Sequence, residues 1–268
     1  MNVLVIGSGG REHAICRSLA RSPHLDRLFV LPGNAGTATL GTNIPGSAED
    51  IELALSVARR EKVDLTIVGP EDPLAAGIVD AFEQAGLRVF GPTAAAARIE
   101  TDKSYAKQLM RRSAVPTAEA RIFDDYRQAQ RYIATRDEPV VVKAAGLAKG
   151  KGVIVCDDPA DGILAAERML AHGEFGAAGR RIVVEERLEG REASVLAMVD
   201  GHTLAVLEPA QDYKRLNDGD QGPNTGGMGS FCPTPVLDDA TLRQIERQIL
   251  VPTLDALVQE GIHYRGVL

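Results

Sequence analysis

The stretch VVVKAAGLAKGKGVIV, residues 140–155, contains three glycines and three lysines between two runs of β-branched residues. Such runs predict a strand on each side, joined by a glycine-rich loop. Glycine lets main-chain N–H groups approach an anion closely, and lysine neutralises the negative charge of that anion. The segment therefore predicts a polyphosphate site in a loop between two strands.

The P-loop pattern, G-x-x-x-x-G-K-[ST], does not describe this loop. Counted from Gly146, the second glycine comes one position early, at Gly150, and Gly152 follows Lys151 where Ser or Thr should stand. The loop is therefore not expected to open a helix. The strands near 140 and 153, with another near 183, instead predict a small antiparallel sheet in which the loop acts as a lid.

The lysines of this segment carry different predictions. Lys143 ends a β-branched strand, so we expect its ammonium group to be held in place beside a nucleotide. The alternative is a lysine that extends from the strand end into solvent. Lys149 and Lys151 fit either phosphate ligands or solvated loop charges.

Length and composition favour a soluble globular protein. The chain has 268 residues, is 44% hydrophobic and 25% charged, and carries a net charge of −7, which argues against non-specific nucleic-acid binding. No apolar run has the length of a membrane span, and a strand-like segment begins at once, without a signal peptide. The three cysteines are expected to be reduced and buried, which favours a cytoplasmic location. The five scattered histidines do not predict a metal site.

The first hundred residues alternate between predicted strands and helices. Apolar strands are expected at 2–7, 27–33, 63–71 and 87–92, and helices at 11–22, 48–62 and 73–86. This alternation predicts a parallel sheet covered on both faces. Its functional loops should meet at the carboxyl ends of the strands, where residues 7–13, 32–37 and 69–73 are rich in glycine or proline.

The motif GSGGRE after the first strand invites comparison with dinucleotide-binding sites. The third glycine of that fingerprint should stand at Glu12, and the second strand ends in Leu31 and Pro32 rather than an acid, so NAD binding is disfavoured. A phosphate or small-anion site with Arg11 as a bidentate partner fits better. A plain strand–helix turn, with Arg11 in a surface ion pair, is the alternative.

The rest of the chain has a different pattern. A helix capped by Thr101 is expected at 101–113, then an extended segment around 115–123, helices at 124–135 and 158–171, and strands at 139–143, 153–156 and 181–187. Residues 192–208 predict a hairpin turning at Asp200 and Gly201. Residues 209–235 show no hydrophobic period and predict a long irregular segment, followed by a helix at 238–260 and a strand at the end.

Two polar clusters in this part suggest chemistry. Glu185 and Glu186 close a strand and can offer backbone groups to an adenine, and Glu192 can take ribose hydroxyls; a solvated edge is the alternative. The segment QDYKR combines an acid with Lys214 and Arg215, and PNTGGMG predicts a turn whose N–H groups converge on an anion. A mobile surface loop would also explain that segment.

Several motifs occur together and in order: VLVIGSGGREHA, PGNAGT, DLTIVGPEDPL, FGPT, KAAGLAKGKGVIV, EASVLAMVDG, QDYKR and GPNTGGMG. In this order the chain resembles the glycinamide ribonucleotide synthetases, from residue 2 to its last residue. The resemblance implies an ATP-grasp fold, in which the glycine-rich loop is a flap over the phosphates of ATP. It also implies an N-terminal parallel α/β substrate domain at 1–103 and an incomplete ATP-grasp domain at 104–268, with a lid at about 118–190.

The implied reaction joins glycine to 5-phosphoribosylamine, with cleavage of ATP to ADP and phosphate and with Mg²⁺ or Mn²⁺ as cofactor. Glycine's carboxylate would attack the γ-phosphate, and the amine would displace phosphate from glycyl phosphate. Catalysis would come from positioning and charge stabilisation under a closed lid. We expect no nucleic-acid or membrane partner and a monomeric protein.

The resemblance also implies site residues. Lys103 and Lys143 would contact phosphate, Glu185, Glu186 and Leu188 would face adenine, and Glu192 would bind ribose. The flap would contribute Gly146, Lys149, Gly150, Lys151 and Gly152. Asp212 and Lys214 are implied as catalytic. Substrate binding is implied for Gly9, Gly10, Arg11, Glu12, Gly33, Asn34, Ala35, Gly36 and Thr37 on the phosphoribosyl side, and for Asn224, Thr225, Gly226, Gly227 and Met228 on the acceptor and γ-phosphate side.

Two departures from the family pattern affect these expectations. Ala145 stands where the family usually has Asp, which is expected to alter the ordering of the flap. The family continues beyond the position of Leu268 into a strand whose Glu and Asn bind magnesium, so no metal ligand is expected in this chain. We therefore expect little or no ligase activity from these 268 residues alone.

Two rival interpretations remain open. One is another ATP-grasp carboxylate–amine ligase, such as a purine-pathway carboxylase or a dipeptide ligase, although these lack the combination of GPNTGGMG and PGNAGT. The other is a non-catalytic, nucleotide-binding ATP-grasp fragment that keeps the lid and adenine contacts.

Overall fold

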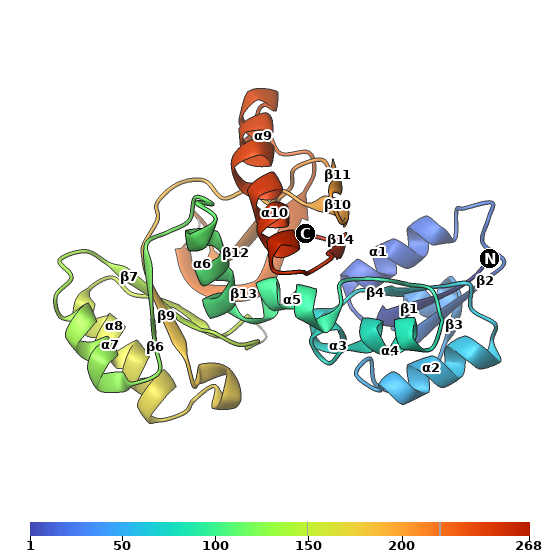
Figure 1. Ribbon diagram of the computed structural model, residues 1–268, viewed down its shortest axis with the longest axis horizontal. Helices are drawn as coiled ribbons and strands as arrows, with labels where there is room; N and C mark the ends of the chain where they lie inside the picture. Colours follow the sequence, from blue (N-terminus) through green and yellow to red (C-terminus); the bar gives the residue numbers. More distant parts are fainter. Residues whose placement is uncertain (149, 220) are drawn as a thin grey trace. The chain divides into compact units, whose positions relative to one another are not determined.

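A computed structural model describes residues 1–148, 150–219 and 221–268 (Figure 1). The chain forms two compact units. The N-terminal unit contains residues 1–98, 199–201 and 262–267, and the second unit contains 99–198, 202–261 and 268.

The N-terminal unit is built on a five-stranded sheet with strand order β3-β2-β1-β4-β5. Neighbouring strands in this order run parallel to each other, so the predicted parallel sheet is confirmed. The short strand β3 and its place at one edge were not predicted. The strands are β1 (Asn2–Gly7), β2 (Arg27–Pro32), β3 (Thr42–Asn43), β4 (Leu65–Val68) and β5 (Val89–Phe90).

Helices cover both faces of this sheet (Figure 1). Helix α1 (Gly10–Leu19) packs Cys16 against Val3 and Val5. On the other face, α2 (Ile51–Arg60) and α4 (Ile78–Gln84) pack against Leu4 and Phe29, with Phe82 fully buried. Since β1 and β2 are buried on both faces, they have near-continuous apolar runs instead of alternating ones.

The prediction of a single helix at 73–86 was wrong. The structure has α3 (Glu71–Ala75) and then α4, and Gly77 between them has a φ of 88°. That left-handed conformation interrupts a right-handed helix and favours glycine. The break lies at a residue that the apolar pattern of the segment does not reveal.

Thr101 does not cap the next helix, as the sequence had predicted. Thr101 is the last residue of α5 (Ala94–Thr101), and Asp102 caps α6 (Lys103–Arg112). Asp102 Oδ1 accepts hydrogen bonds from the backbone N–H groups of Ser104 and Tyr105, at 3.0 and 3.1 Å. A carboxylate satisfies the free donors of a helix start at least as well as a threonine hydroxyl.

The second unit contains a four-stranded sheet with order β6-β9-β7-β8. Neighbouring strands here run antiparallel to each other, which confirms the predicted antiparallel sheet. The strands are β6 (Ala120–Phe123), β7 (Val140–Ala144), β8 (Val153–Val155) and β9 (Ile182–Glu186). The glycine-rich loop joins β7 to β8 and does not open a helix, as expected.

One face of this sheet is apolar and the other carries charge. Helices α7 (Tyr126–Ile133) and α8 (Pro159–Ala166) pack on the first face against Val142 and Val184. A π-helical turn, Glu167–Ala171, extends α8. Because side chains alternate along a strand, Lys143 and Glu185 lie on the opposite face.

A second, three-stranded sheet has the order β11-β10-β14. The predicted hairpin of β10 (Ala197–Asp200) and β11 (Thr203–Val206) and the predicted final strand, β14 (Arg265–Val267), are confirmed. Asp200 is the last residue of β10, so the turn lies at Gly201 and His202, one residue later than predicted.

The prediction of an irregular segment at 209–235 was wrong. Strands β12 (Gln211–Asn217) and β13 (Gln221–Phe231) pair antiparallel as a two-stranded ribbon, with register shifts after Tyr213 and after Arg215. The rings of Tyr213 and Phe231 stack with centroids 6.2 Å apart, and both side chains remain exposed. None of the described side chains of β12 and β13 is buried, so these strands do not need alternating apolar residues, and periodicity missed them.

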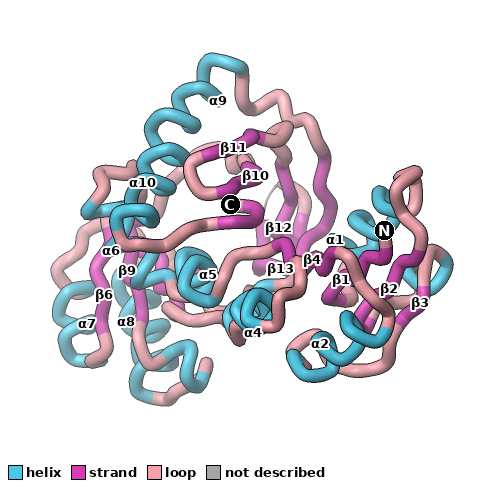
Figure 2. The backbone as a smooth tube through the Cα atoms, turned by 45° about the vertical axis from the view of Figure 1, so that its right-hand side comes forward, coloured by secondary structure: helices cyan, strands magenta, loops and turns pink. Residues whose placement is uncertain are grey.

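The predicted helix at 238–260 is confirmed as a continuous helical run (Figure 2). It begins at α9 (Asp239–Ile245), passes through the π-helical turn Glu246–Leu250 and ends in α10 (Val251–Gln259). Asp238 caps its start. Pro252 lies just after the π-helical turn, and because proline has no backbone N–H, it removes one hydrogen bond from the continuous helix.

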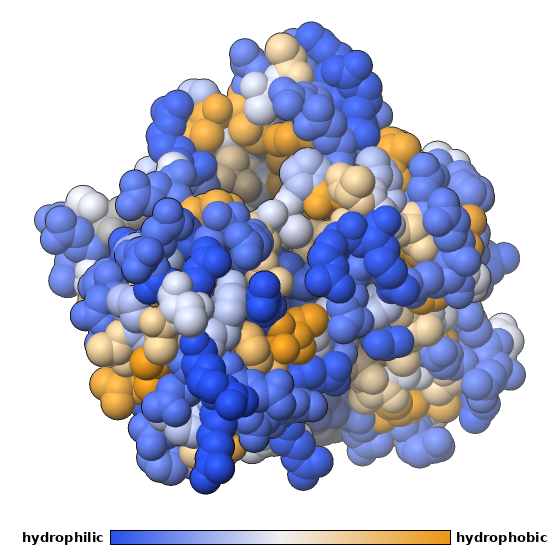
Figure 3. Space-filling model, turned by 60° about the vertical axis from the view of Figure 1, so that its left-hand side comes forward, coloured by the Kyte–Doolittle hydropathy of each residue, from blue (hydrophilic) through white to orange (hydrophobic). Residues whose placement is uncertain are grey.

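Across residues 1–148, 150–219 and 221–268, the structure has no helix that combines the length and the apolar character needed to cross a bilayer. On the face shown in Figure 3, apolar side chains occur as separate patches among hydrophilic ones. Scattered exposed apolar residues of this kind are usual on protein surfaces.

The prediction that all three cysteines are buried holds for Cys16 and Cys156 but not for Cys232, which is exposed. Burial, and to a smaller extent the nearby carboxylates Glu12 for Cys16 and Asp161 for Cys156, raise the pKa of each buried thiol to about 11. These two thiols are therefore almost entirely protonated at neutral pH and poorly nucleophilic.

We expect a thiol-specific reagent such as Ellman's reagent to modify Cys232 rapidly in the native protein. Cys16 and Cys156 should react only after unfolding, because their thiols are both buried and protonated. Stopped-flow absorbance with and without denaturant measures both phases. A Cys232→Ser variant, as the control, should lose the rapid phase. Equal rates for all cysteines in the native protein would contradict the expectation.

Candidate active site

The three predicted loops of the N-terminal unit meet at the carboxyl ends of their strands, as expected. The backbone N–H of Gly33 donates to Gly7 O, and that of Gly69 donates to Ile6 O, both at 3.1 Å. The side-chain amide of Asn34 donates to Ser8 O at 2.9 Å. These bonds join the loops after β1, β2 and β4 into one surface.

Glu12 lies beneath this loop surface and is 4% exposed. Its Oε2 accepts a hydrogen bond from Gly9 N at 2.6 Å. An ideal Cβ on Gly7 would lie 2.6 Å from Glu12 Cγ, and one on Gly69 would lie 2.1 Å from Glu12 Oε1. The carboxylate therefore occupies space that only glycines leave open.

The other loop residues divide into anchored and accessible ones. The backbone N–H of Asn34 donates to Thr37 Oγ1 at 2.8 Å, and that of Thr37 donates to Asn34 Oδ1 at 3.0 Å, so this pair anchors its loop. The side chain of Arg11 is 66% exposed; it donates to Gly69 O at 2.8 Å and lies 4.0 Å from Glu71. Both the anion-binding arginine and the surface ion pair considered above fit this position. Gly10, Ala35 and Gly36 contribute backbone to the same surface.

Lysines gather around one carboxylate in the second unit. Lys143 Nζ, from β7, lies 2.8 Å from Glu185 Oε2, and Lys107 Nζ, from α6, lies 3.4 Å from Glu185 Oε1. Lys103, one turn earlier in α6, donates to the carbonyl of Gly146 at 3.4 Å. The side chain of Glu185 is only 6% exposed, which excludes the solvated edge considered for it.

The electrostatics of this cluster favour an added anion. Burial lowers the pKa of Lys103, and the positive charge of Lys143 lowers it further against the opposing effect of Glu185. Burial likewise lowers the pKa of Lys107 in spite of Glu185. Cations that depress one another's pKa gain stability when an anion such as phosphate is bound.

The glycine-rich loop is tied to this cluster through its backbone. Ala144 N donates to Gly152 O at 2.7 Å, Lys151 N donates to Ala148 O at 2.9 Å, and Gly146 N donates to Ala178 O at 3.1 Å. Gly150 has a φ of 76°, which favours glycine. Ala145 is buried, and its carbonyl accepts from Lys103 N at 2.8 Å. Lys149, another predicted phosphate ligand, lies outside the described residues.

Of the predicted adenine-facing residues, Glu185 and Glu186 end β9 and Leu188 follows it. Glu186 Oε1 accepts from Glu119 N at 2.7 Å, so its side chain supports the neighbouring strand. Leu188 is 68% exposed, with its apolar side chain open to a ligand.

A second charged cluster joins the predicted catalytic pair to the predicted ribose acid. Lys214 Nζ contacts Glu192 Oε1 and lies 3.7 Å from Asp212 Oδ2. Burial acts to lower the pKa of Lys214, but the Glu192 and Asp212 carboxylates outweigh it, and the pKa is raised. Lys214 is therefore a firmly charged cation rather than a general base.

Residues 224–229, which were predicted to form a glycine-rich turn, are part of strand β13, so that prediction was wrong. The hydroxyl of Thr225 donates to Lys214 O at 2.9 Å and accepts from Gly227 N at 3.0 Å. Met228 is 57% exposed. The side chain of Asn224 and the surroundings of Gly226 lie outside the described part of the structure.

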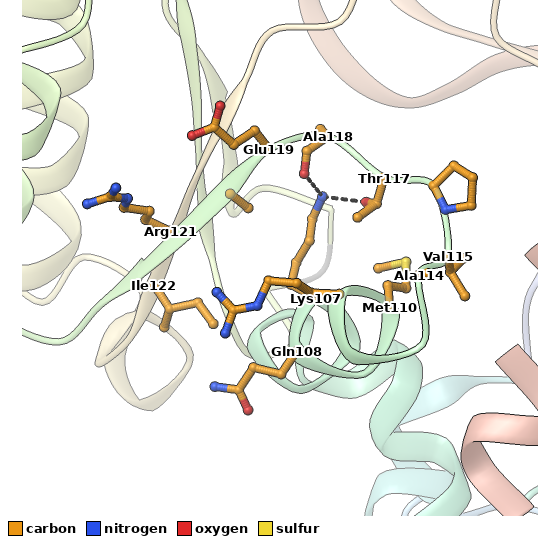
Figure 4. A pocket seen from close by; sticks show the side chains of 13 residues that line it. Lys107, Gln108, Met110, Ala114, Val115, Thr117, Ala118, Glu119, Arg121 and Ile122 are labelled. Carbon is orange, nitrogen blue, oxygen red and sulfur yellow. Dashed lines mark hydrogen bonds between the residues drawn. The ribbon is translucent and has the colours of Figure 1, made fainter. Parts of the chain in front are cut away.

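Lys107 is the residue of this region that we did not predict from the sequence. It follows Lys103 by one helical turn, and that spacing places the two lysines on the same helix face. This spacing is the sequence signal from which Lys107 could have been predicted. Lys107 also lines a pocket of about 520 Å³ between α6 and residues 114–122, which contains none of the predicted site residues (Figure 4).

An antiparallel sheet whose glycine-rich hairpin loop adjoins lysines from a strand and a helix, after a parallel α/β unit, defines the ATP-grasp class. Comparison with known families agrees with this assignment. The chain belongs to the phosphoribosylglycinamide synthetase family: the N-domain model of that family matches residues 1–100, and its ATP-grasp (A) domain model matches residues 101–268. The predicted resemblance is confirmed.

Individual relatives support the same family. The phosphoribosylamine–glycine ligase of Rhodopirellula baltica is 50% identical over 273 residues, which cover 100% of this chain and 62% of that protein. The solved phosphoribosylamine–glycine ligase of Thermotoga maritima has a TM-score of 0.85 at 34% identity, covering 100% of this chain and 64% of that one. The biotin carboxylase domain of the Hydrogenobacter thermophilus 2-oxoglutarate carboxylase shares the fold, with a TM-score of 0.72 at 17% identity and coverage of 99% and 59%. The chain thus spans less than two thirds of the length of these proteins.

Proposed function

We propose that the chain provides the nucleotide-binding and phosphoribosyl-binding parts of an ATP-dependent carboxylate–amine ligase. The reaction joins glycine to 5-phosphoribosylamine and gives glycinamide ribonucleotide, ADP and phosphate, a step of purine biosynthesis. The observation that carries the proposal is the arrangement of Lys103 beside Gly146 and of Lys143 on Glu185, in a chain matched by both family models.

The nucleotide would lie on the charged face of the sheet β6-β9-β7-β8. Lys103 and Lys143 are placed to neutralise phosphate charge, and the glycines of the loop, which carry no Cβ, would let a phosphate approach the backbone closely. Glu185 and Glu186 at the end of β9, together with Leu188, would face the adenine ring. The exposed side chain of Leu188 supports this assignment, because an aromatic base gains by covering apolar surface.

The acid–lysine cluster would act where phosphate and glycine meet. A carboxylate is a poor acyl donor until one of its oxygens becomes a good leaving group, so glycine would first be converted to glycyl phosphate. The charged side chain of Lys214, held by Glu192 and Asp212, can stabilise negative charge that develops on the transferred phosphoryl group. Closure of the loop would exclude water from the anhydride.

The N-terminal loops would hold the phosphoribosyl group. The exposed guanidinium of Arg11 and the backbone of Gly9, Gly10 and residues 33–37 form one surface. Arginine and free N–H groups at a helix start both favour a phosphate. Buried Glu12 supports this surface from below.

A magnesium ion is implied by the class, since the Hydrogenobacter thermophilus domain was solved in complex with MgADP. Within the part of the chain that the structure describes, no three or more His, Cys, Asp or Glu side chains lie together as a metal site would require. We assign none of the described residues to the metal. The three free cysteines support our further proposal that the protein acts in a reducing, cytoplasmic setting.

We expect the chain to bind ATP in isothermal titration calorimetry and to release little or no ADP in the presence of glycine and phosphoribosylamine. Addition of the unmatched portion of a relative, as a separate polypeptide, should restore glycine-dependent ADP release. Release that depends on bicarbonate instead of glycine would favour another ATP-grasp ligase. ATP binding without turnover, even after the addition, would favour a non-catalytic fragment, and failure to bind ATP would contradict the proposal.

A further inference from the structure

Lys107 is held more tightly than the neighbouring lysines. Its ammonium group donates to Thr117 Oγ1 at 2.6 Å and to Ala118 O at 3.0 Å (Figure 4). It also lies 3.4 Å from Glu185 Oε1. Thr117 and Ala118 engage two of its three N–H donors, and the ammonium group also forms an ion pair with Glu185. With a side chain only 12% exposed, Lys107 is a fixed internal cation.

Glu185 shares its two carboxylate oxygens between two lysines. Oε1 faces Lys107 and Oε2 faces Lys143. A buried carboxylate that loses its only cationic partner is strongly destabilised, so such a group either keeps a partner or becomes protonated. Two partners allow one of them to leave without that cost.

Lys143 is the partner that is able to leave. Its side chain is 27% exposed, its ammonium group donates to Glu185, and it stands at the end of the strand that enters the glycine-rich loop. Lys107, in contrast, is attached to the segment before β6 as well as to Glu185. A phosphate that binds here would therefore pair with Lys143 and not with Lys107.

We propose that Lys107 is a positioning residue that keeps Glu185 neutralised, so that Lys143 can turn from Glu185 to a nucleotide phosphate. Lys107 itself does not touch the nucleotide. The inference rests on the nucleotide binding proposed above and adds a role that the phosphate ligands do not have. Without Lys107, Lys143 stays paired with Glu185, and the phosphate loses part of the attraction that Lys143 would otherwise provide.

The test compares ATP with adenosine, which has no phosphate, in isothermal titration calorimetry. Lys107→Met should weaken ATP binding about tenfold, which corresponds to ~1.4 kcal/mol, and should leave adenosine binding within about twofold. Lys107→Gln, which keeps an amide donor toward Thr117 and Ala118 but no charge, should behave in the same way. Lys107→Arg keeps the charge and should remain close to the unmodified protein.

A double variant shows whether the effect passes through Glu185. Glu185→Gln removes the charge that Lys107 neutralises and keeps the backbone of β9, so adding Lys107→Met to it should change ATP affinity by less than about twofold. Circular dichroism confirms that each variant is folded, and if Lys107→Met does not fold, the Lys107→Gln variants decide. Three outcomes would overturn this inference and leave the proposed function standing. They are an unchanged ATP affinity in both Lys107→Met and Lys107→Gln, equal losses of affinity for ATP and adenosine, and a full loss of about tenfold when Lys107→Met is added to Glu185→Gln. Failure of the unmodified chain to bind ATP would overturn the proposed function and this inference together.

Discussion

Replacement of Lys143 by methionine is expected to weaken ATP binding roughly 30- to 150-fold, or about 2 to 3 kcal/mol. Lys143 is the more accessible lysine of the pair that holds Glu185, and it stands where β7 enters the glycine-rich loop. Its loss removes a charge-assisted hydrogen bond to phosphate and leaves Glu185 with Lys107 alone. Methionine keeps the length and most of the packing of the side chain, so the fold should persist.

Calorimetric titration with ATP, in low and in high salt, measures this effect. Lys62→Met is the matched control, because Lys62 is an exposed lysine of the N-terminal unit, and its replacement should leave ATP binding unchanged. The difference between Lys143→Met and the unmodified chain should shrink at high salt as phosphate contacts are screened. A Lys143→Met protein that is folded and binds ATP as tightly as the unmodified chain would show that Lys143 does not contact phosphate.

Replacement of Gly7 by alanine is expected to destabilise the N-terminal unit by about 2 to 5 kcal/mol. Gly7 has a φ of 125°, which is strained for any residue with a Cβ. The new methyl group would also lie 2.6 Å from Cγ of the buried Glu12. Glu12 would have to move, and its hydrogen bond from Gly9 would be lost.

Urea unfolding followed by far-ultraviolet circular dichroism is the suitable measurement, because the chain contains no tryptophan. Gly10→Ala is the control: no atom lies within 4 Å of the ideal Cβ of Gly10, the first residue of α1. Its effect should be within about 0.5 kcal/mol, since alanine is the better helix former. Adding Glu12→Ala to Gly7→Ala should recover part of the loss, because it relieves the collision but not the backbone strain. A Gly7→Ala protein as stable as the unmodified chain would contradict this account of the loop surface.

Local rules predicted much of the fold correctly. The β-branched runs and the alternation of strands and helices in the first hundred residues predicted a parallel sheet, and the structure has one. The segment at 140–155 predicted two strands joined by a glycine-rich loop, and β7 and β8 are joined by that loop. These features depend on residues close together in the chain, so composition and periodicity are sufficient to find them.

Other features depend on partners far along the chain and were missed. The ribbon of β12 and β13 is stabilised by pairing between strands and by the stacked rings of Tyr213 and Phe231, and neither leaves a periodic pattern. The helix break at Gly77 follows from one left-handed residue, and the cap at Asp102 from a side chain that can bond to the first turn of the helix. In each case the local sequence pattern was compatible with more than one local structure.

By itself, the sequence determined the class of sheet in each unit, the strand–loop–strand that carries Lys143, and the motifs that relate the chain to its family. Only the tertiary structure placed Lys107 and Lys143 on the two oxygens of Glu185, residues that come from a helix and two strands. The physical reason is that ion pairing and burial depend on distance in space. A buried carboxylate between two cations requires α6 to pack against β9, and the residues of neither element specify that contact alone.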